Sequence, residues 1–222
     1  MNILVIGAGG VGASMASIAE SRSFFQSFTL ADVLIESAQR AIAVLDDPGR
    51  FRAVQLDARS EDNIVALIRE VGADIVVNAC DPRLNEPIFR ACLTAEVHYL
   101  DMAMNLSRPH PTDPYNQVGD ILGKEQLAAH DAWVEKGLLA LVGMGVEPGL
   151  SDVFARYASD HLFDEIDEIG VRDGANLAIE GYDFAPTFSI WTTIEECLNP
   201  PLVWEKSRGI FTTNCFSEPE VF

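Results

Sequence analysis

Short apolar runs alternate with segments of helical period along the first hundred residues. The apolar runs predict buried strands at residues 3–6, 28–31, 53–56, 75–78 and 98–100. The segments between them predict helices over residues 13–21, 34–45, 61–71 and 85–94. This alternation is typical of parallel strands with helices on both faces, and right-handed crossovers make such a sheet doubly wound. The pattern therefore predicts an α/β fold with a doubly wound parallel sheet.

The next part of the chain keeps the alternation and adds an irregular connection. Residues 107–116 contain three prolines and little periodicity, so they predict a crossing loop. A helix over 124–136 is expected to stop at Gly137, and a sixth buried strand is expected over 138–142. A further helix over 151–161 follows. These elements extend the predicted sheet by one strand.

A different pattern begins after that helix. Residues 165–172 alternate as in a half-exposed strand, residues 188–198 have helical period, and residues 201–213 read as one or two strands. We therefore expect one domain over 1–150 and the start of a mixed α+β domain over 151–222. Since the second domain has few strands with which to bury a face, we expect it to be incomplete and the chain to be truncated.

A glycine-rich turn follows the first expected strand. Gly7, Gly9 and Gly12 fit the G-x-G-x-x-G pattern between a strand and a helix, which places a dinucleotide pyrophosphate on the helix N-terminus. Gly7 permits the tight turn, Gly9 lets the backbone approach the pyrophosphate, and Gly12 lets the helix pack on the strand. The pattern predicts a Rossmann NAD(P)-binding domain over 1–150, with a flexible loop as the alternative. The expected contacts in this turn are Gly7, Ala8, Gly9, Gly10, Val11 and Gly12.

Acidic residues end the second and third strands. Asp32 stands 20 residues after Gly12, where a carboxylate accepts hydrogen bonds from the adenosine ribose. A 2′-phosphate would meet this negative charge, and no Lys or Arg follows Asp32 directly. We therefore expect NAD, with NADP possible. Asp57 and Ala58 follow the third strand near the expected adenine position. Helix capping is the alternative role for both acids.

Three residues end the fourth strand above the crevice where the nicotinamide half of the cofactor would lie: Asn78, Ala79 and Cys80. Ala79 supplies the small side chain that close approach of the cofactor requires. Cys80 is either a nucleophile or a small buried side chain. The second role is favoured, because the sequence offers no readable partner base.

Composition narrows the classes of partner. The chain carries 15 basic and 34 acidic side chains, for a net charge of −19, which argues against nucleic acid and anionic membranes as partners. The four cysteines form no C-x-x-C pair, so we expect no metal site and reduced thiols. No apolar run has the length of a membrane span and no leader pattern precedes the first strand, so we expect a cytoplasmic protein.

Two further segments narrow the prediction to a family. One is residues 76–82 leading to 91–101, and the other is residues 143–152, Gly-Met-Gly-Val-Glu-Pro-Gly-Leu-Ser-Asp. With the N-terminal glycines they resemble the saccharopine dehydrogenase/reductase family, which includes carboxynorspermidine dehydrogenases. Residues 29–33 are similar to NAD-linked lysine 6-dehydrogenases of that family. The resemblance covers most of residues 1–165, and it implies that the second domain binds substrate and forms a homodimer.

The resemblance implies hydride transfer between NAD(P) and the carbon of a C–N bond, through an imine, in an amino acid or related amine. It places the turn of Glu147, Pro148 and Gly149 toward the substrate and the nicotinamide. Glu147 is then a candidate to bind the substrate amine or to accept its proton. A solvent-exposed loop acid is the alternative.

Other candidate substrate contacts lie on the fifth strand and in the second domain. Tyr99 and Asp101 end the fifth strand on one side of the sheet. Asp101 is a candidate for proton transfer or amine binding, with a loop cap as the alternative. Arg172 is the candidate partner for a substrate carboxylate.

Two other functions stay open at this point. One is a carboxynorspermidine- or homospermidine-type enzyme of polyamine metabolism, which acidic groups in the second-domain cleft would favour. The other is a regulator that binds NAD(P) without chemistry. A pair of arginines in that cleft would instead favour a dicarboxylate substrate.

Overall fold

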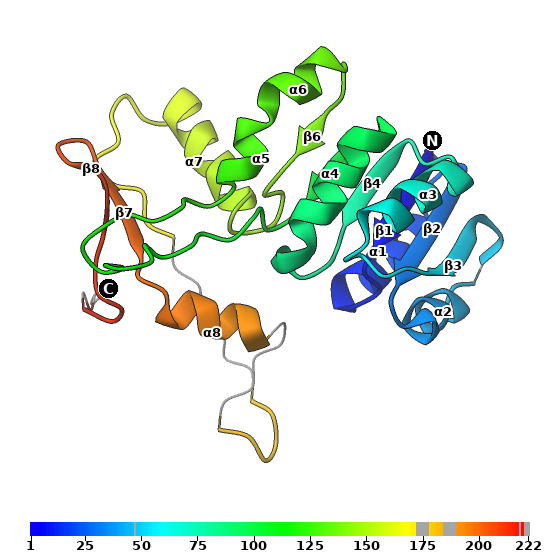
Figure 1. Ribbon diagram of the computed structural model, residues 1–222. Helices are drawn as coiled ribbons and strands as arrows, with labels where there is room; N and C mark the ends of the chain where they lie inside the picture. The colour runs from blue at the N-terminus through cyan, green and yellow to red at the C-terminus, as the bar shows by residue number, and fades with distance from the viewer. Residues whose placement is uncertain (47, 172–177, 184–189, 218, 220–222) are drawn as a thin grey trace. The chain divides into compact units, whose positions relative to one another are not determined.

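The computed structural model describes residues 1–46, 48–171, 178–183, 190–217 and 219. Its main feature is a six-stranded parallel sheet with the order β3-β2-β1-β4-β5-β6 (Figure 1). The order reverses between β1 and β4, so the Rossmann topology predicted from the sequence is confirmed. The strands are β1 (Asn2–Ile6), β2 (Ser27–Asp32), β3 (Phe51–Gln55), β4 (Ile75–Asn78), β5 (His98–Asp101) and β6 (Ala140–Leu141).

Helices connect these strands. The helix over 61–71 and the strand over 75–78 have the predicted bounds. The single helix predicted over 124–136 is instead two short helices. The helix is divided because Ala129 N donates to Gln126 O, an i→i+3 bond that tightens the turn there. The helices of this part are α1 (Gly10–Glu20), α2 (Ile35–Ala43), α3 (Glu61–Val71), α4 (Asn85–Ala95), α5 (Lys124–Ala128), α6 (His130–Glu135) and α7 (Leu150–His161), with the 3₁₀ turns η1 (Pro48–Arg50) and η2 (Pro82–Leu84).

The side chains of β1 bury both faces of the sheet. Leu4 and Ile6 belong to the core under α3 and α4, while Ile3 and Val5 belong to the core under α1 and α2. Successive strand residues point to opposite faces, so a continuous apolar run is required where helices cover both. The near-continuous apolar pattern of the first strand has this physical cause.

Predicted helix ends are confirmed where their chemistry is local. Ser60 Oγ accepts a hydrogen bond from Asn63 N at 3.3 Å and caps α3. Gly72 ends the same helix with φ of 58°, and Gly137 follows α6 with φ of 66°. These caps fix where α3 and α6 end.

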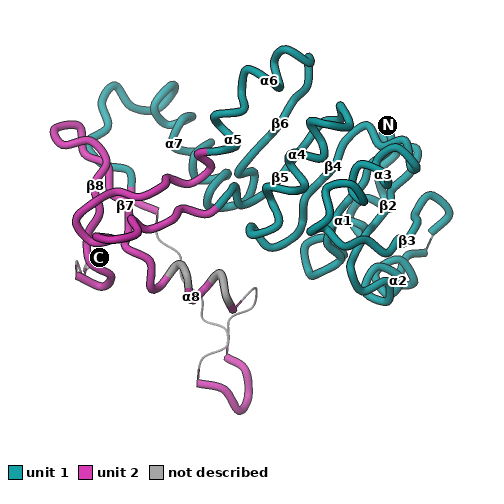
Figure 2. The backbone as a smooth tube through the Cα atoms, viewed as in Figure 1, with its two compact units in different colours: residues 1–105, 125–169 teal, residues 106–124, 170–222 magenta. Residues whose placement is uncertain are grey.

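The chain divides into two compact units (Figure 2). The first comprises residues 1–105 and 125–169, and the second comprises 106–124 and 170–222. This division differs from the expected boundary at residue 150, because α7 belongs to the first unit. The predicted crossing loop belongs to the second unit.

The second unit contains α8 (Ile190–Leu198) and an antiparallel hairpin of β7 (Leu202–Glu205) and β8 (Gly209–Thr212). The expectation of strands over 201–213 is thus confirmed. The predicted strand over 165–172 is wrong for its described part, since residues 165–171 pair with no other strand. Alternating side chains do not form a strand without a neighbour to complete the hydrogen-bond ladder.

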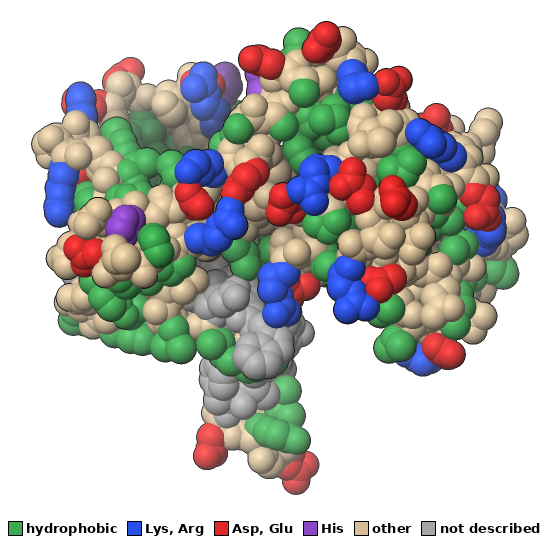
Figure 3. Space-filling view, viewed as in Figure 1, with side chains coloured by type: hydrophobic (Ala, Val, Ile, Leu, Met, Phe, Trp, Pro, Cys, Tyr) green, Lys and Arg blue, Asp and Glu red, His purple; other side chains and the backbone are tan. Residues whose placement is uncertain are grey.

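Surface cations are widely paired with acids (Figure 3). Arg52 contacts Glu70 at 2.6 Å, and Lys136 contacts Glu96 at 2.6 Å. The pairing leaves the surplus of acidic groups uncompensated, which is unfavourable for polyanionic partners. In the described part of the chain, no helix combines the length and apolarity needed to cross a bilayer.

Candidate functional site

A cleft of about 490 Å³ opens at the carboxyl edge of the sheet, where the strand order reverses. Ligands of open α/β sheets bind at this place. Seven of the twelve residues expected to contact the cofactor line the cleft: Gly7, Gly9, Asp32, Asp57, Ala58, Ala79 and Cys80. The other lining residues are Ile6, Val33, Leu56, Arg59, Asp81 and Leu84.

The glycine turn leaves the N-terminus of α1 open. A Cβ on Gly12 would lie 1.9 Å from the Gly7 carbonyl oxygen, and one on Gly7 would lie 2.6 Å from the Ala79 oxygen. A Cβ on Gly9 would meet nothing within 4 Å, so the space above it is free for a ligand. The helix has no acid in its first turn and no side-chain cap. An anionic pyrophosphate therefore fits this end of α1.

Asp32 ends β2 and faces the cleft half-buried. Its Oδ2 accepts from Ala8 N at 2.8 Å and its Oδ1 accepts from Leu34 N at 2.9 Å. Each carboxylate oxygen keeps a further lone pair for a hydroxyl group. The carboxylate is therefore held in a fixed orientation from which it can accept hydrogen bonds from ribose. Ala8 itself is buried and contributes through its backbone.

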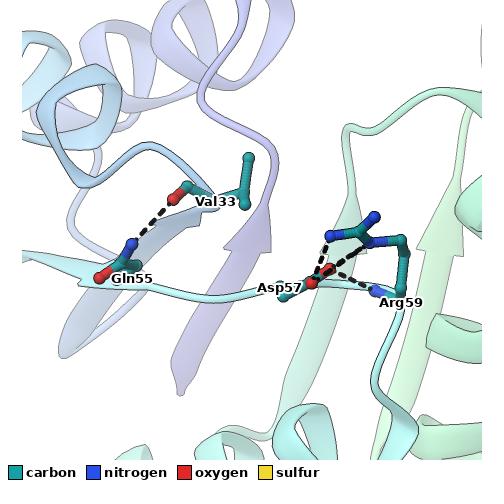
Figure 4. Close-up of polar contacts among 4 residues, drawn as sticks. All are labelled: Val33, Gln55, Asp57 and Arg59. Carbon is teal, nitrogen blue, oxygen red and sulfur yellow. Dashed lines mark hydrogen bonds and ion pairs between the residues drawn. The ribbon is translucent and has the colours of Figure 1, made fainter.

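Asp57 and Arg59 form a bidentate pair just beyond β3 (Figure 4). Arg59 Nε donates to Asp57 Oδ1 at 2.9 Å, and its Nη2 donates to Oδ2 at 2.7 Å. These bonds, with one from the Arg59 backbone, lower the pKa of Asp57 to about 2. Nearby, Gln55 Nε2 donates to Val33 O at 3.0 Å and ties the ends of β3 and β2 together. Sequence reasoning missed Arg59, although its spacing from Asp57 gave a usable signal.

Asn78 turns away from the cleft although its neighbours line it. Its amide is buried, and its Nδ2 donates to Asn85 Oδ1 at 2.7 Å and to the Tyr99 hydroxyl at 3.2 Å. Its Oδ1 accepts from Cys80 N at 3.0 Å, so it shapes the turn that carries Ala79 and Cys80. The role that the structure indicates for Asn78 is positioning, not cofactor contact.

Cys80 has the environment of an inert thiol. Its Sγ–H donates to the Ile6 carbonyl at 3.3 Å. Burial, followed by the negative charges of Asp32 and Asp81, raises the thiol pKa to about 12. A thiol with this pKa is not a nucleophile near neutral pH, which supports the small-side-chain role.

Tyr99 and Asp101 are buried, contrary to the expectation that they face substrate; each is 1% exposed. The Tyr99 hydroxyl donates to Asp101 Oδ2 at 2.9 Å, and Gln126 Nε2 donates to the same oxygen at 2.6 Å. Met104 N and Gly143 N donate to Oδ1 at 3.1 and 2.7 Å. Burial and the nearby carboxylate raise the pKa of Tyr99. Four internal donors thus occupy Asp101, which holds the segments around it in place.

The turn after β6 carries the remaining predicted contacts. Gly145 N donates to Pro148 O at 2.9 Å, and Gly149 N donates to Asp152 Oδ2 at 2.8 Å. Gly149 has φ of 134°, and a Cβ there would lie 2.3 Å from the Gly145 oxygen. Glu147, at the tip of the turn, is exposed. The turn is therefore compact, and it presents Glu147 outward.

The remaining predictions concern Arg172, a metal site and the end of the glycine turn. Arg172 falls outside the described residues. Within the described ranges, no group of three or more His, Cys, Asp or Glu side chains is placed to hold a metal ion. Gly10, Val11 and Gly12 lie in the first turn of α1 and do not line the cleft.

Comparison with known proteins assigns this chain to a family. Residues 3–141 match the family model described as saccharopine dehydrogenase NADP binding domain. Carboxynorspermidine synthase of Vibrio alginolyticus is 35% identical over 216 residues, which cover 94% of this chain and 51% of that protein. Carboxyaminopropylagmatine dehydrogenase of Synechocystis sp. is 32% identical over 194 residues, 87% of this chain and 46% of that protein. The chain spans about half the length of these relatives.

A solved structure supports the fold. Apo saccharopine dehydrogenase (L-Glu forming) of Saccharomyces cerevisiae matches with a TM-score of 0.55 at 15% identity, covering 72% of this chain and 31% of that chain. The expected class of cofactor, an NAD(P) dinucleotide, agrees with the family description. By the match over residues 3–141, the chain belongs to the family of saccharopine dehydrogenase NADP-binding domains.

Proposed function

We propose that this chain forms the cofactor half of an NAD(P)-dependent oxidoreductase that transfers hydride at the C–N bond of an amine. The observation that carries the proposal is the cleft of about 490 Å³ at the reversal of strand order. There the open Gly9 and the oriented Asp32 match the phosphate and the ribose of a dinucleotide. Membership of the saccharopine dehydrogenase family supports the same assignment.

We assign each part of the dinucleotide to residues of the glycine turn or of the cleft. The backbone from Gly7 to Gly12 and the N-terminus of α1 receive the pyrophosphate. Asp32 accepts hydrogen bonds from the adenosine ribose, Asp57 and Ala58 border the adenine, and Ala79 admits the nicotinamide half. When bound, the nicotinamide donates or accepts the hydride.

Substrate binding is proposed for the turn that follows β6. Glu147, exposed at its tip, binds the substrate amine or accepts its proton, while Pro148 and Gly149 shape the turn. Asp101 acts one step away from the substrate, because its Oδ1 accepts from Gly143 N at the start of this segment. The proton at the C–N bond is thus assigned to an exposed carboxylate held on a compact turn.

The relatives favour a carboxylated polyamine as substrate. Their names, carboxynorspermidine synthase and carboxyaminopropylagmatine dehydrogenase, describe amines that carry a carboxyl group. A cationic amine suits a chain with net charge −19. An amino acid such as lysine or saccharopine is the second substrate class, supported by the family description.

The remaining assignments rest on the sequence and on the relatives. Residues 151–222 are proposed to begin a substrate-binding and dimerisation domain, with Arg172 binding a substrate carboxylate. A cytoplasmic homodimer is the proposed form of the protein. Light scattering of the purified chain with its natural flanking sequence tests the oligomeric state.

An assay of NADH and NADPH oxidation, and of NAD and NADP reduction, across three substrates tests the proposal. The substrates are lysine, saccharopine and carboxynorspermidine, each with the natural full-length protein. We expect turnover with carboxynorspermidine, reduced strongly by Glu147→Gln and little by Glu125→Gln. Nucleotide binding without turnover of any substrate would refute the enzyme assignment and leave a nucleotide-binding regulator.

A further inference from the structure

An arginine, Arg59, lines the same cleft as Asp32, the residue expected to distinguish NAD from NADP. Asp32 ends β2 opposite Gln55 of β3, and Leu56 N donates to Asp32 O at 2.9 Å, so the segment that carries Arg59 starts beside Asp32. NADP carries a phosphate on the adenosine ribose, the group that Asp32 faces. An arginine near the adenosine ribose is the kind of residue that accommodates a 2′-phosphate.

The guanidinium of Arg59 is engaged elsewhere. It binds Asp57 through Nε and Nη2, and the Arg59 backbone N–H donates to the same carboxylate at 3.0 Å (Figure 4). The pair is open to solvent, with the Arg59 side chain 76% and the Asp57 side chain 41% exposed. Among the residues that the structure describes, no other Lys or Arg lines the cleft, whereas Asp32, Asp57 and Asp81 do. The described cleft is therefore net acidic.

We infer that Asp57 is a specificity-determining residue. Because its carboxylate accepts hydrogen bonds from both Nε and Nη2 of Arg59, it keeps that guanidinium from binding a 2′-phosphate. Asp32 and Asp57 then act together in favour of NAD(H), the first by repulsion and the second by occupying Arg59. This inference rests on the class of cofactor and not on the proposed reaction. Nucleotide binding alone therefore tests it.

The ion pair between Asp57 and Arg59 does not depend on pH near neutrality. The hydrogen bonds from Arg59 lower the pKa of Asp57 to about 2, so its carboxylate stays ionised at neutral pH. Both partners are exposed, and so their attraction weakens as salt screens it. The selectivity is expected to change with ionic strength more than with pH.

The test compares dissociation constants of NADH and NADPH for the purified chain with its natural flanking sequence. Asp57→Asn keeps an oxygen for the Arg59 backbone N–H but removes the charge that holds the guanidinium. We expect it to tighten NADPH relative to NADH about tenfold, as one charge-assisted hydrogen bond can, and the ratio of the two constants removes any effect on the adenine that both nucleotides share. Adenosine 2′,5′-bisphosphate and AMP, titrated in the same way, isolate the 2′-phosphate.

Two further variants make the result specific. Asp57→Asn combined with Arg59→Ala is expected to return the ratio of the two constants to the wild-type value. Glu70→Gln removes one negative charge from the exposed Arg52–Glu70 pair, which does not line the cleft, and is expected to change neither nucleotide. Unfolding in urea checks that all variants are folded.

Three outcomes would overturn the inference. An unchanged ratio of the two constants in Asp57→Asn would show that Arg59 does not serve the 2′-phosphate when released. A gain that survives Arg59→Ala, or that Glu70→Gln reproduces, would show a general charge effect. Equal weakening of NADH and NADPH in Arg59→Ala would place Arg59 on a part that both nucleotides share.

Discussion

The ends of β2 and β3 differ from the ends of β4 and β5 in how they use polar side chains. Asp32, Asp57 and Arg59 at the first pair line an open cleft. Asn78 and Asp101 at the second pair are at most 2% exposed, and their oxygens accept from other groups of the protein. All four strands end at the same edge of one parallel sheet, yet Asp32, Asp57 and Arg59 line the cleft whereas Asn78 and Asp101 do not.

The difference shows that position in the fold does not by itself assign a residue to a ligand. An exposed carboxylate with spare lone pairs can bind, whereas a buried one with four donors is part of the framework. Mutation separates the two: the first kind of residue should affect binding, and the second should affect stability.

The largest expected effect is on stability at Asp101. Asp101→Ala leaves the Tyr99 hydroxyl and the donors at Gln126 and Gly143 without their buried acceptor, so we expect a loss of about 3 kcal/mol or more in the free energy of unfolding. Urea unfolding followed by circular dichroism measures it. The exposed Asp62→Ala, with an expected change within about 1 kcal/mol, is the control. A loss of unfolding free energy smaller than that of the control would contradict the structural role of Asp101.

The next effect concerns binding at Asp32. Asp32→Ala is expected to weaken NADH at least about tenfold and to relax the preference for NADH over NADPH, because it removes the acceptor for ribose. Fluorescence titration gives both constants, and urea unfolding should show a smaller loss than in Asp101→Ala. Unchanged discrimination between the two nucleotides would remove this assignment of Asp32.

A smaller effect is expected at Tyr99. Tyr99→Phe removes one hydroxyl, while Asp101 Oδ2 keeps Gln126 and Asn78 keeps Asn85. We expect a loss of about 1 kcal/mol in unfolding free energy and an unchanged NADH constant. A large change in NADH binding with normal stability would place Tyr99 at the ligand after all.

The smallest effect is a pH dependence at Cys80. Burial raises its pKa from 9.0 to about 12, so the folded chain retains the thiol proton that the unfolded chain loses. The contribution is complete below pH 9 and is lost between pH 9 and 12, with about 1 kcal/mol gone at pH 10. Unfolding free energies at pH 8 and 10 should therefore differ more in the wild type than in Cys80→Ala. Equal slopes would contradict the buried thiol.

The sequence predicts well those elements whose causes are local. The helix over 61–71 follows from Ser60, its apolar period and Gly72, and the strand over 75–78 follows from one apolar run. In the glycine turn, Gly7 and Gly12 are required by local sterics, since a Cβ on Gly12 would meet the Gly7 oxygen and one on Gly7 would meet the adjacent end of β4 at Ala79. These features do not depend on distant parts of the chain.

The features that the sequence does not predict depend on distant partners. Asp101 is buried because Gln126, 25 residues away, donates to its carboxylate. The helix over 124–136 is divided at Ala129. Arg59 becomes a candidate binding residue only because β3 pairs with β2, which brings the segment after β3 to the cleft. Alternation alone predicts a strand over 165–172, but it does not supply the pairing partner that the described residues 165–171 lack.

Titration of the chain with NADH, followed by the nicotinamide fluorescence, tests whether this cleft binds a dinucleotide. We expect saturable binding at one site, weakened at least about tenfold by Asp32→Ala and unchanged by Tyr99→Phe. Gly9→Ala should weaken binding without loss of stability, since a Cβ there meets only open space in the protein. No saturable binding, or binding that neither Asp32→Ala nor Gly9→Ala reduces, would contradict the assignment of this cleft to a dinucleotide.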